Sequence, residues 1–215
     1  MPITSASDNP LACSDDWRII FKGPVAAVPL PVDDDKDPRP WASTVTNALL
    51  AGYPDVDSDT ASTLADTLVD AALDSRTRKP LFAFSFCPDP TSGELARIEL
   101  RQIVALPDQR EPTLDALRDY FAMSTPDGID EPEIVYGDLR IGRTVRVRRK
   151  FAAATDEFGD ALVVQTVVYV TCPENPVRLD CAVVLFMSWT AVPHSERLFE
   201  LADQLAETLR LRPRK

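Results

Sequence analysis

The chain has 215 residues, of which 45% are hydrophobic and 27% charged, and its formal net charge is -11. This composition is typical of a folded globular protein, and the excess of negative charge excludes general electrostatic attraction to nucleic acid or to anionic lipid. An anionic partner would have to meet a local basic patch.

Residues 1–40 differ in composition from the rest of the chain. They hold seven of the nineteen prolines and the acidic run DDDKD at 33–37. Proline fixes φ and cannot donate a backbone hydrogen bond, so this segment is predicted to be an N-terminal arm with one or two edge strands, in WRIIFK and VAAVPL. Residues 41–215 are predicted to form a single domain.

Helical periodicity begins at Trp41 and returns after Asp59, which predicts two successive helices. Alternating apolar residues at 81–86 and 96–106 flank the turn PDPTSGE and predict an antiparallel hairpin. A third helix is predicted over Thr113 to Met123, with its apolar residues on one side.

The C-terminal half predicts a meander of three strands followed by a helix. The strands run from Arg143 to Phe151, Leu162 to Val170 and Cys181 to Trp189, and their connections are too short for a crossover helix. Neighbouring strands should therefore pair antiparallel. In the final helix, Ser195 is the predicted N-cap and Arg210 is placed in the last turn.

Two of these strands, ALVVQTVVYV and CAVVLFMSW, are nearly apolar on both faces, which indicates that both faces of the sheet are covered. The predicted fold is therefore α+β, an antiparallel β-sheet of five to seven strands with helices on both faces.

The location of the protein follows from what the chain lacks. Its apolar stretches are far shorter than the roughly 20 residues that a helix needs to cross a bilayer, and the N-terminus has neither the basic start nor the apolar run of a secretory signal. We therefore expect a cytoplasmic protein.

The cysteines, Cys13, Cys87, Cys172 and Cys181, form no Cys-x-x-Cys pair, so no structural zinc is expected. In a reducing compartment Cys172 and Cys181, which flank a predicted turn, would remain thiols.

The C-terminal segment LFMSWTAVPHSERLFELADQLAETLRL, residues 185–211, resembles the ending of a family of uncharacterised actinobacterial proteins, in which an apolar strand, a turn with proline and a helix follow one another. The order of the upstream elements extends the resemblance over residues 41–211. The matching residues are Pro193, Leu198, Phe199, Leu205, Ala206, Thr208, Leu209 and Arg210.

The resemblance implies a PsbP-like α/β sandwich. Relatives of that fold are mostly binding and accessory proteins, among them a nuclear-import regulator that binds a small GTPase and chaperones that load secreted effectors. Some of the actinobacterial proteins are encoded near type VII secretion genes. Likeness at the level of fold transfers no catalytic residue.

The sequence offers no conventional catalytic set. His194 is the only histidine, and it lies beside a predicted helix start rather than near a nucleophile motif. With seven glycines in the chain, neither a Walker loop nor a G-x-G-x-x-G motif occurs. We therefore expect no catalytic residue and no cofactor.

Two acidic segments are candidate metal sites. The segment DVDSDTASTLAD, Asp55 to Asp66, has the first carboxylates of a calcium loop but has Thr60 where the loop needs glycine and Asp66 where it needs glutamate. Capping of the second helix by Asp57 and Asp59 is the favoured interpretation. The run at 33–37 is interpreted as a solvated loop, and no metal is expected.

The most unusual stretch is RIGRTVRVRRK, residues 140–150, because it carries six basic side chains in an acidic chain. Alternation places its valines on one face of a strand and a basic row on the other. The row could be a solvated, edge-protecting surface, could pair with the acidic N-terminal arm, or could bind an acidic protein segment or a phosphate-bearing ligand. The candidate interface residues are Arg143, Arg146, Arg148 and Lys150.

The sequence thus leaves two functions open. The first is a non-enzymatic cytoplasmic accessory protein that binds another protein, in its most concrete form a secretion-associated chaperone or adaptor. The second is a small anionic-ligand-binding protein or enzyme, with a pocket between sheet and helices lined by Arg146, Arg148 and Tyr169. The oligomeric state and the partner are not determined by the sequence.

Overall fold

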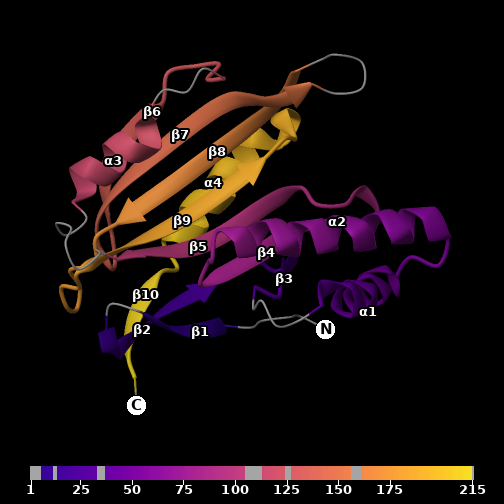
Figure 1. Cartoon of the computed structure of the whole chain (residues 1–215), viewed down its shortest axis with the longest axis horizontal. Coiled ribbons are helices and arrows are strands. Elements are labelled where there is room, and N and C mark those ends of the chain that lie inside the picture. The colour runs from indigo at the N-terminus through magenta and orange to yellow at the C-terminus, as the bar shows by residue number, and fades with distance from the viewer. Residues whose placement is uncertain are drawn as a thin grey trace.

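The computed structural model describes residues 6–11, 14–32, 37–104, 113–123, 127–155 and 161–214. These residues form a seven-stranded antiparallel sheet, a three-stranded sheet and four α-helices, so the predicted α+β class is confirmed (Figure 1). The large sheet has the strand order β3-β4-β5-β9-β8-β7-β6, and the small sheet has the order β1-β2-β10.

The strands of the large sheet include every strand predicted after residue 41. The hairpin β4–β5 and the meander β7–β8–β9 pair antiparallel as expected, because their short connections allow nothing else. The bounds are β3 (Ala27–Pro29), β4 (Phe82–Phe86), β5 (Ala96–Val104), β6 (Glu133–Leu139), β7 (Gly142–Thr155), β8 (Ala161–Thr171) and β9 (Cys181–Trp189).

The first two helices begin at aspartate caps. The Asp37 carboxylate accepts a hydrogen bond from the backbone of Arg39, and that of Asp57 accepts one from Thr60 at 2.7 Å. The predicted cap at Asp57 is confirmed, while Asp59 lies inside the first turn because the second helix begins earlier than expected. The helices are α1 (Pro38–Leu50), α2 (Ser58–Thr77), α3 (Leu114–Ala122) and α4 (Ser195–Ala206).

Both predicted termini of α4 are wrong. A 3₁₀ turn over Val192–His194 leads into the helix, so His194 takes the N-cap position without a side-chain hydrogen bond. Ser195 is already helical, and its hydroxyl donates to the Val192 carbonyl. Arg210 lies beyond the helix in β10 (Arg210–Pro213), since the chain turns back into a strand after residue 206.

Helices cover both faces of the large sheet, as predicted (Figure 1). On one face, α1 and α2 pack over β3 and β4 through Leu64 and Leu68, and α3 packs over β7 and β8 through Leu117. On the other face, α4 packs through Leu198 and Phe199. Each buried side chain of this size contributes about 1.5–3 kcal/mol, so both layers stabilise the sheet.

The described part of the N-terminal segment is packed into the fold. The two predicted strands are present: β3 lies at an edge of the large sheet, whereas β2 (Ser14–Lys22) lies between β1 (Ala6–Leu11) and β10. Ile19 and Phe21 of β2 are fully buried in the core on the α4 side. Residues 33–36 of the acidic run lie outside the described residues, and so does any pairing of that run with the basic row.

Among the described residues, no helix combines the length and apolar character needed to cross a bilayer.

Candidate functional site

The most distinctive surface of the molecule is the outer edge of β6. This strand is the last of the large sheet, and it pairs with β7 along its whole length, from Glu133 opposite Arg148 to Leu139 opposite Gly142. The preceding residues 127–130 follow the same side of β7, with a bridge between Gly128 and Phe151. No described strand pairs with the other side of residues 127–139, which we call the β6 edge.

The two edges of the large sheet differ in how strongly they oppose an added strand. At the opposite edge, β3 has three residues and ends in Pro29, which cannot donate to an added strand. By contrast, β6 has seven residues and contains neither proline nor lysine. Its outward N–H and C=O groups are therefore available to a further strand.

Exposed apolar side chains are concentrated in the β6 edge and in the end of α3 that precedes it in sequence. The described residues include twelve large apolar side chains that are strongly exposed, and six of them fall between residues 120 and 136. Such a concentration is unusual, since single exposed apolar residues are normal on a surface but contiguous groups mark interaction sites. The six are Tyr120 (66% exposed), Met123 (60%), Ile129 (50%), Tyr136 (47%), Val135 (41%) and Ile134 (40%).

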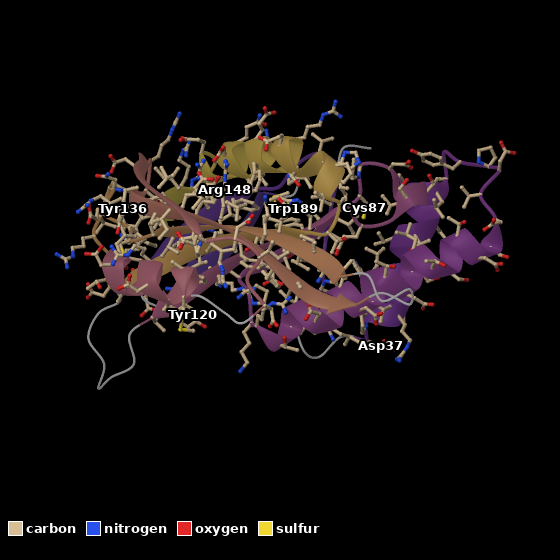
Figure 2. All side chains as sticks on the ribbon, turned by 90° about the horizontal axis from the view of Figure 1, so that it is seen from above. Asp37, Cys87, Tyr120, Tyr136, Arg148 and Trp189 are labelled. Atoms are coloured by element: carbon tan, nitrogen blue, oxygen red, sulfur yellow. The ribbon has the colours of Figure 1, made fainter. Side chains whose placement is uncertain are left out.

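On the α3 side, Tyr136 fixes the edge to the helix. Its hydroxyl donates to the Asp115 carboxylate at 3.0 Å and accepts from the Arg118 guanidinium at 2.5 Å. Figure 2, which looks down on the molecule from above, places Tyr136 and Tyr120 toward the same end of the chain's long axis. The aromatic ring of Tyr136 is thus held in place while much of its surface remains open to solvent.

On the α4 side, the edge contributes an acid to the basic row of β7. Arg146 donates to Glu133 at 3.0 Å and to Asp203 of α4 at 3.1 Å. Arg148 lies 3.5 Å from Glu133 and 3.8 Å from Asp203, and its guanidinium stacks on the Phe199 ring at 4.1 Å. The two central arginines are therefore matched by two carboxylates from the same molecule.

The outer members of the predicted basic interface lie apart from this pair. Lys150 is 3.3 Å from Asp130 of the β6 edge. Arg143 faces the α3 side instead, where it lines a pocket of about 310 Å³ together with Tyr136, Cys172 and Cys181. Burial raises the pKa of the Cys172 thiol, and neither cysteine forms a disulfide.

Tyr169, predicted to line a ligand pocket with Arg146 and Arg148, donates its hydroxyl to the Asp203 carboxylate. Burial and this neighbouring carboxylate raise the pKa of Tyr169 far above its usual value. The structure therefore brings the three predicted groups together around Asp203, which accepts hydrogen bonds from Tyr169 and Arg146 and lies 3.8 Å from Arg148.

A second charged cluster lies between α2 and the sheet. Glu99 of β5 is fully buried, and its carboxylate accepts hydrogen bonds from Ser75 at 2.8 Å, from Arg78 at 2.6 Å and from Arg101 at 2.8 Å. These arginines lower the pKa of Glu99 although its burial acts in the opposite direction. The adjoining trough of about 430 Å³ has a partly apolar floor that includes Phe186, on which Arg101 stacks at 5.0 Å.

The remaining predicted motifs contribute no catalytic geometry. His194 is exposed at the start of α4, and the calcium-like segment forms the capped start of α2. In the part of the chain that is described, no group of three or more His, Cys, Asp or Glu side chains is arranged to hold a metal.

The β6 edge also has a defined charge. Residues 127–139, DGIDEPEIVYGDL, contain five acidic residues and no basic residue. Asp130 and Glu133 are engaged with the basic row. The edge therefore presents an apolar strand bordered by the carboxylates of Asp127, Glu131 and Asp138.

The sequence interpretation missed this site because it did not recognise β6. The stretch EIVYGDL is short, follows Pro132 and contains Gly137, so it resembles a loop. Its signal was the apolar run Ile134 to Tyr136 immediately before the basic strand. Asp203 was missed for another reason, since it lies 57 residues from Arg146 along the chain.

No protein-family model and no curated protein sequence matches the chain. Membership in the actinobacterial family therefore stays a prediction.

Proposed function

We propose that the protein is a non-enzymatic accessory protein that binds an extended segment of another protein at the β6 edge. The single observation that supports this is an edge strand that no described strand covers and that carries exposed apolar side chains at Ile134, Val135 and Tyr136. Addition of a strand uses backbone hydrogen bonds for affinity and alternate side chains for specificity.

The chemistry of the edge defines the partner segment. Strand addition requires an extended backbone, and the exposed Ile134, Val135 and Tyr136 favour apolar side chains on both faces of that strand. The bordering carboxylates favour lysine or arginine nearby and disfavour acidic segments. We therefore propose a partner segment in which apolar and basic residues alternate.

The resemblance described from the sequence favours a secretion-associated chaperone or adaptor as the most specific form of this function, acting in the cytoplasm. Strand addition at an exposed sheet edge is a recurring way in which proteins, chaperone–pilin complexes among them, bind an extended segment, which agrees with the proposed role of β6.

The alternative, a pocket for a small anionic ligand or a substrate, has less support. The guanidinium groups of Arg146 and Arg148 are matched by Glu133 and Asp203, so an incoming anion would have to displace a carboxylate. A thermal-shift screen with anionic metabolites separates the two functions, because clear stabilisation by one small molecule would favour the alternative.

The proposal is tested by Val135→Lys, which places a charge on the edge in the manner that natural sheets use to prevent strand addition. The matched control is Leu73→Lys on α2, where the native side chain has a similar exposure of 44%. A stoichiometric partner recovered from native cells with the wild type should be lost with Val135→Lys and kept with Leu73→Lys.

The contact is then located by hydrogen exchange. The partner should slow exchange at the outward-facing backbone amides, which alternate along residues 133–139, because strand addition places these amides in hydrogen bonds whereas the others already bond to β7. Retention of the partner by Val135→Lys, or protection elsewhere with none in β6, would exclude the β6 edge as the binding site.

A further inference from the structure

A trough lies on the face of the large sheet that α2 and α3 share. The two helices cover different parts of this face, α2 over β3 and β4 and α3 over β7 and β8 (Figure 1). The trough of about 430 Å³ beside the Glu99 cluster reaches from α2 and β5 across β9 to β8 and β7. Its volume falls within the range of small-molecule sites, roughly 300–1,000 Å³.

The floor of the trough is largely apolar but carries two hydroxyl groups. Phe151, Val164 and Phe186 supply apolar surface, and each of them is half-buried. Thr166 of β8 and Ser188 of β9 stand directly opposite each other in the register, so their side chains are neighbours on one face of the sheet. An apolar surface with a few placed polar groups is typical of a small-ligand site.

Thr166 is the residue of this floor that points most directly to a ligand. It is 4% exposed, and neither its hydroxyl nor that of Ser188 forms a side-chain hydrogen bond within the described part of the chain. Burial of a polar group costs free energy unless the group is hydrogen-bonded. An acceptor group on a bound molecule provides the missing partner for both hydroxyls.

One wall of the trough adds a guanidinium group. Arg101 stacks on Phe186 at 5.0 Å, and its Nε and Nη2 atoms donate to Glu99. Its Nη1 atom donates to no described group, and its one carboxylate partner is shared with Arg78. Arg101 therefore keeps a donor for an anionic group of a molecule that lies against Phe186.

The other charged groups of the trough are paired with one another. Arg97 donates to Glu94 at 2.7 Å and lies 3.4 Å from Asp74, which also pairs with Arg78. With Glu99 included, the three arginines of the trough meet three carboxylates. The wall is therefore neutral as a whole, and the donors without a partner decide which ligand it prefers.

We propose that the trough binds a small carboxylic acid with an apolar body. The body lies on the apolar floor, and the carboxylate accepts hydrogen bonds from Thr166, Ser188 and Arg101. All three of these groups can donate to an anion, and hydrogen bonds to a charged acceptor are stronger than those to a neutral one.

This site is separate from the surfaces discussed above. Arg146 and Arg148 lie on the opposite face of the sheet, where Arg148 stacks on Phe199 of α4. The β6 edge is not part of the trough. A ligand in the trough therefore leaves strand addition at β6 unaffected, and thermal stabilisation by an acid that is lost on substitution of Thr166 belongs to the trough.

The ligand class is tested by isothermal titration calorimetry of the full chain with octanoate as the probe. Octanol has an apolar chain of the same length without the charge, and acetate has the charge without the apolar body. Octanoate should bind about ten times more tightly than octanol, since hydrogen bonds to a charged group are lost with the alcohol. Acetate should bind more weakly still, because it buries almost no apolar surface.

The position of the ligand is tested by Thr166→Val combined with Ser188→Ala, which removes both hydroxyls from the floor. Octanoate binding should weaken about tenfold or more, while the melting temperature stays unchanged or rises, because the described structure loses no hydrogen bond. The matched control is Thr46→Val. Thr46 is 3% exposed and its hydroxyl also has no partner, but it lies in α1 and outside the trough, so binding should be unchanged.

If the double variant does not fold, Ser188→Ala alone, at a half-buried position, is measured in its place and should also weaken binding. Absence of octanoate binding to the wild type, or equal affinities for octanoate and octanol, would overturn the proposal. The same holds if substitution of the two hydroxyls leaves the affinity unchanged, or if Thr46→Val lowers it equally.

Discussion

Replacing Glu99 by glutamine should destabilise the protein more than any other single isosteric change in its charged clusters. The side chain keeps its volume, but Arg78 and Arg101 lose the one carboxylate that both contact. Breaking a buried ion pair by removing one partner costs about 3–5 kcal/mol. Arg78 retains Asp74 as a second partner, and both arginines reach solvent in part, so we expect the lower limit, about 3 kcal/mol.

For a chain of this size, 1 kcal/mol corresponds to about 2–4 °C in melting temperature, so Glu99→Gln should lower Tm by about 6–12 °C. Thermal unfolding followed by circular dichroism measures this at neutral pH. Asp74→Asn is the matched control, because the Asp74 side chain is 57% exposed and its pairs with Arg78 and Arg97 should contribute less than about 1 kcal/mol.

The pH dependence of the difference in stability between wild type and Glu99→Gln is the more specific test of the role of the Glu99 carboxylate. The pKa of Glu99 is lowered in the folded state, so its stabilising contribution is complete above the ordinary glutamate pKa of about 4.3 and is lost as the pH falls through the lowered value. The difference in stability between wild type and Glu99→Gln should therefore shrink below about pH 4. A difference below about 1 kcal/mol at pH 7, or one that is constant between pH 7 and pH 3, would refute this reasoning.

Two further predictions concern β7 and β8. Gly142→Ala should lower the free energy of unfolding by about 3 kcal/mol or more, since a Cβ at this position would lie 2.2 Å from the Cys172 carbonyl oxygen. Gly52→Ala is the control, because a Cβ there has nothing within 4 Å, and it should leave the denaturation midpoint unchanged or raise it. Similar midpoints for the two variants would contradict the close approach at Gly142. Tyr169→Phe should leave the alkaline titration of tyrosine absorbance unchanged up to about pH 11, because burial and Asp203 raise the pKa of Tyr169. If the variant lost one ionising tyrosine below that pH, the contact between Tyr169 and Asp203 would be contradicted.

The elements that the sequence predicted correctly are those whose periodicity is long and local. The strand over β8 has eleven residues and α2 has twenty, so apolar alternation and helical spacing could identify both without tertiary information. The missed strands β1, β6 and β10 have between four and seven residues. Short segments carry little periodic signal, and β10 forms only because β2, far away in sequence, is available to pair with it.

The site shows the same limit at the level of side chains. The basic face of β7 could be derived from alternation alone, and the structure places Arg146 and Arg148 on one face as expected. Their partners could not be derived, because Glu133 belongs to an unrecognised strand and Asp203 to a helix that reaches β7 only through the packing of the sheet. A row of charged side chains on one strand can be predicted from the sequence, whereas the carboxylates that pair with it are known only from the tertiary structure.

The distribution of charge explains how a long, apolar sheet edge can remain exposed. Two copies of the chain that met edge to edge would bring the carboxylates of Asp127, Glu131 and Asp138 against their own counterparts, in molecules that each carry a net charge of -11. Both the local and the overall repulsion oppose self-pairing. A basic extended segment meets neither obstacle, since the same charges attract it. The acidic residues that border β6 therefore select against a second copy and in favour of the proposed partner, so raising the salt concentration should weaken partner binding and promote self-association.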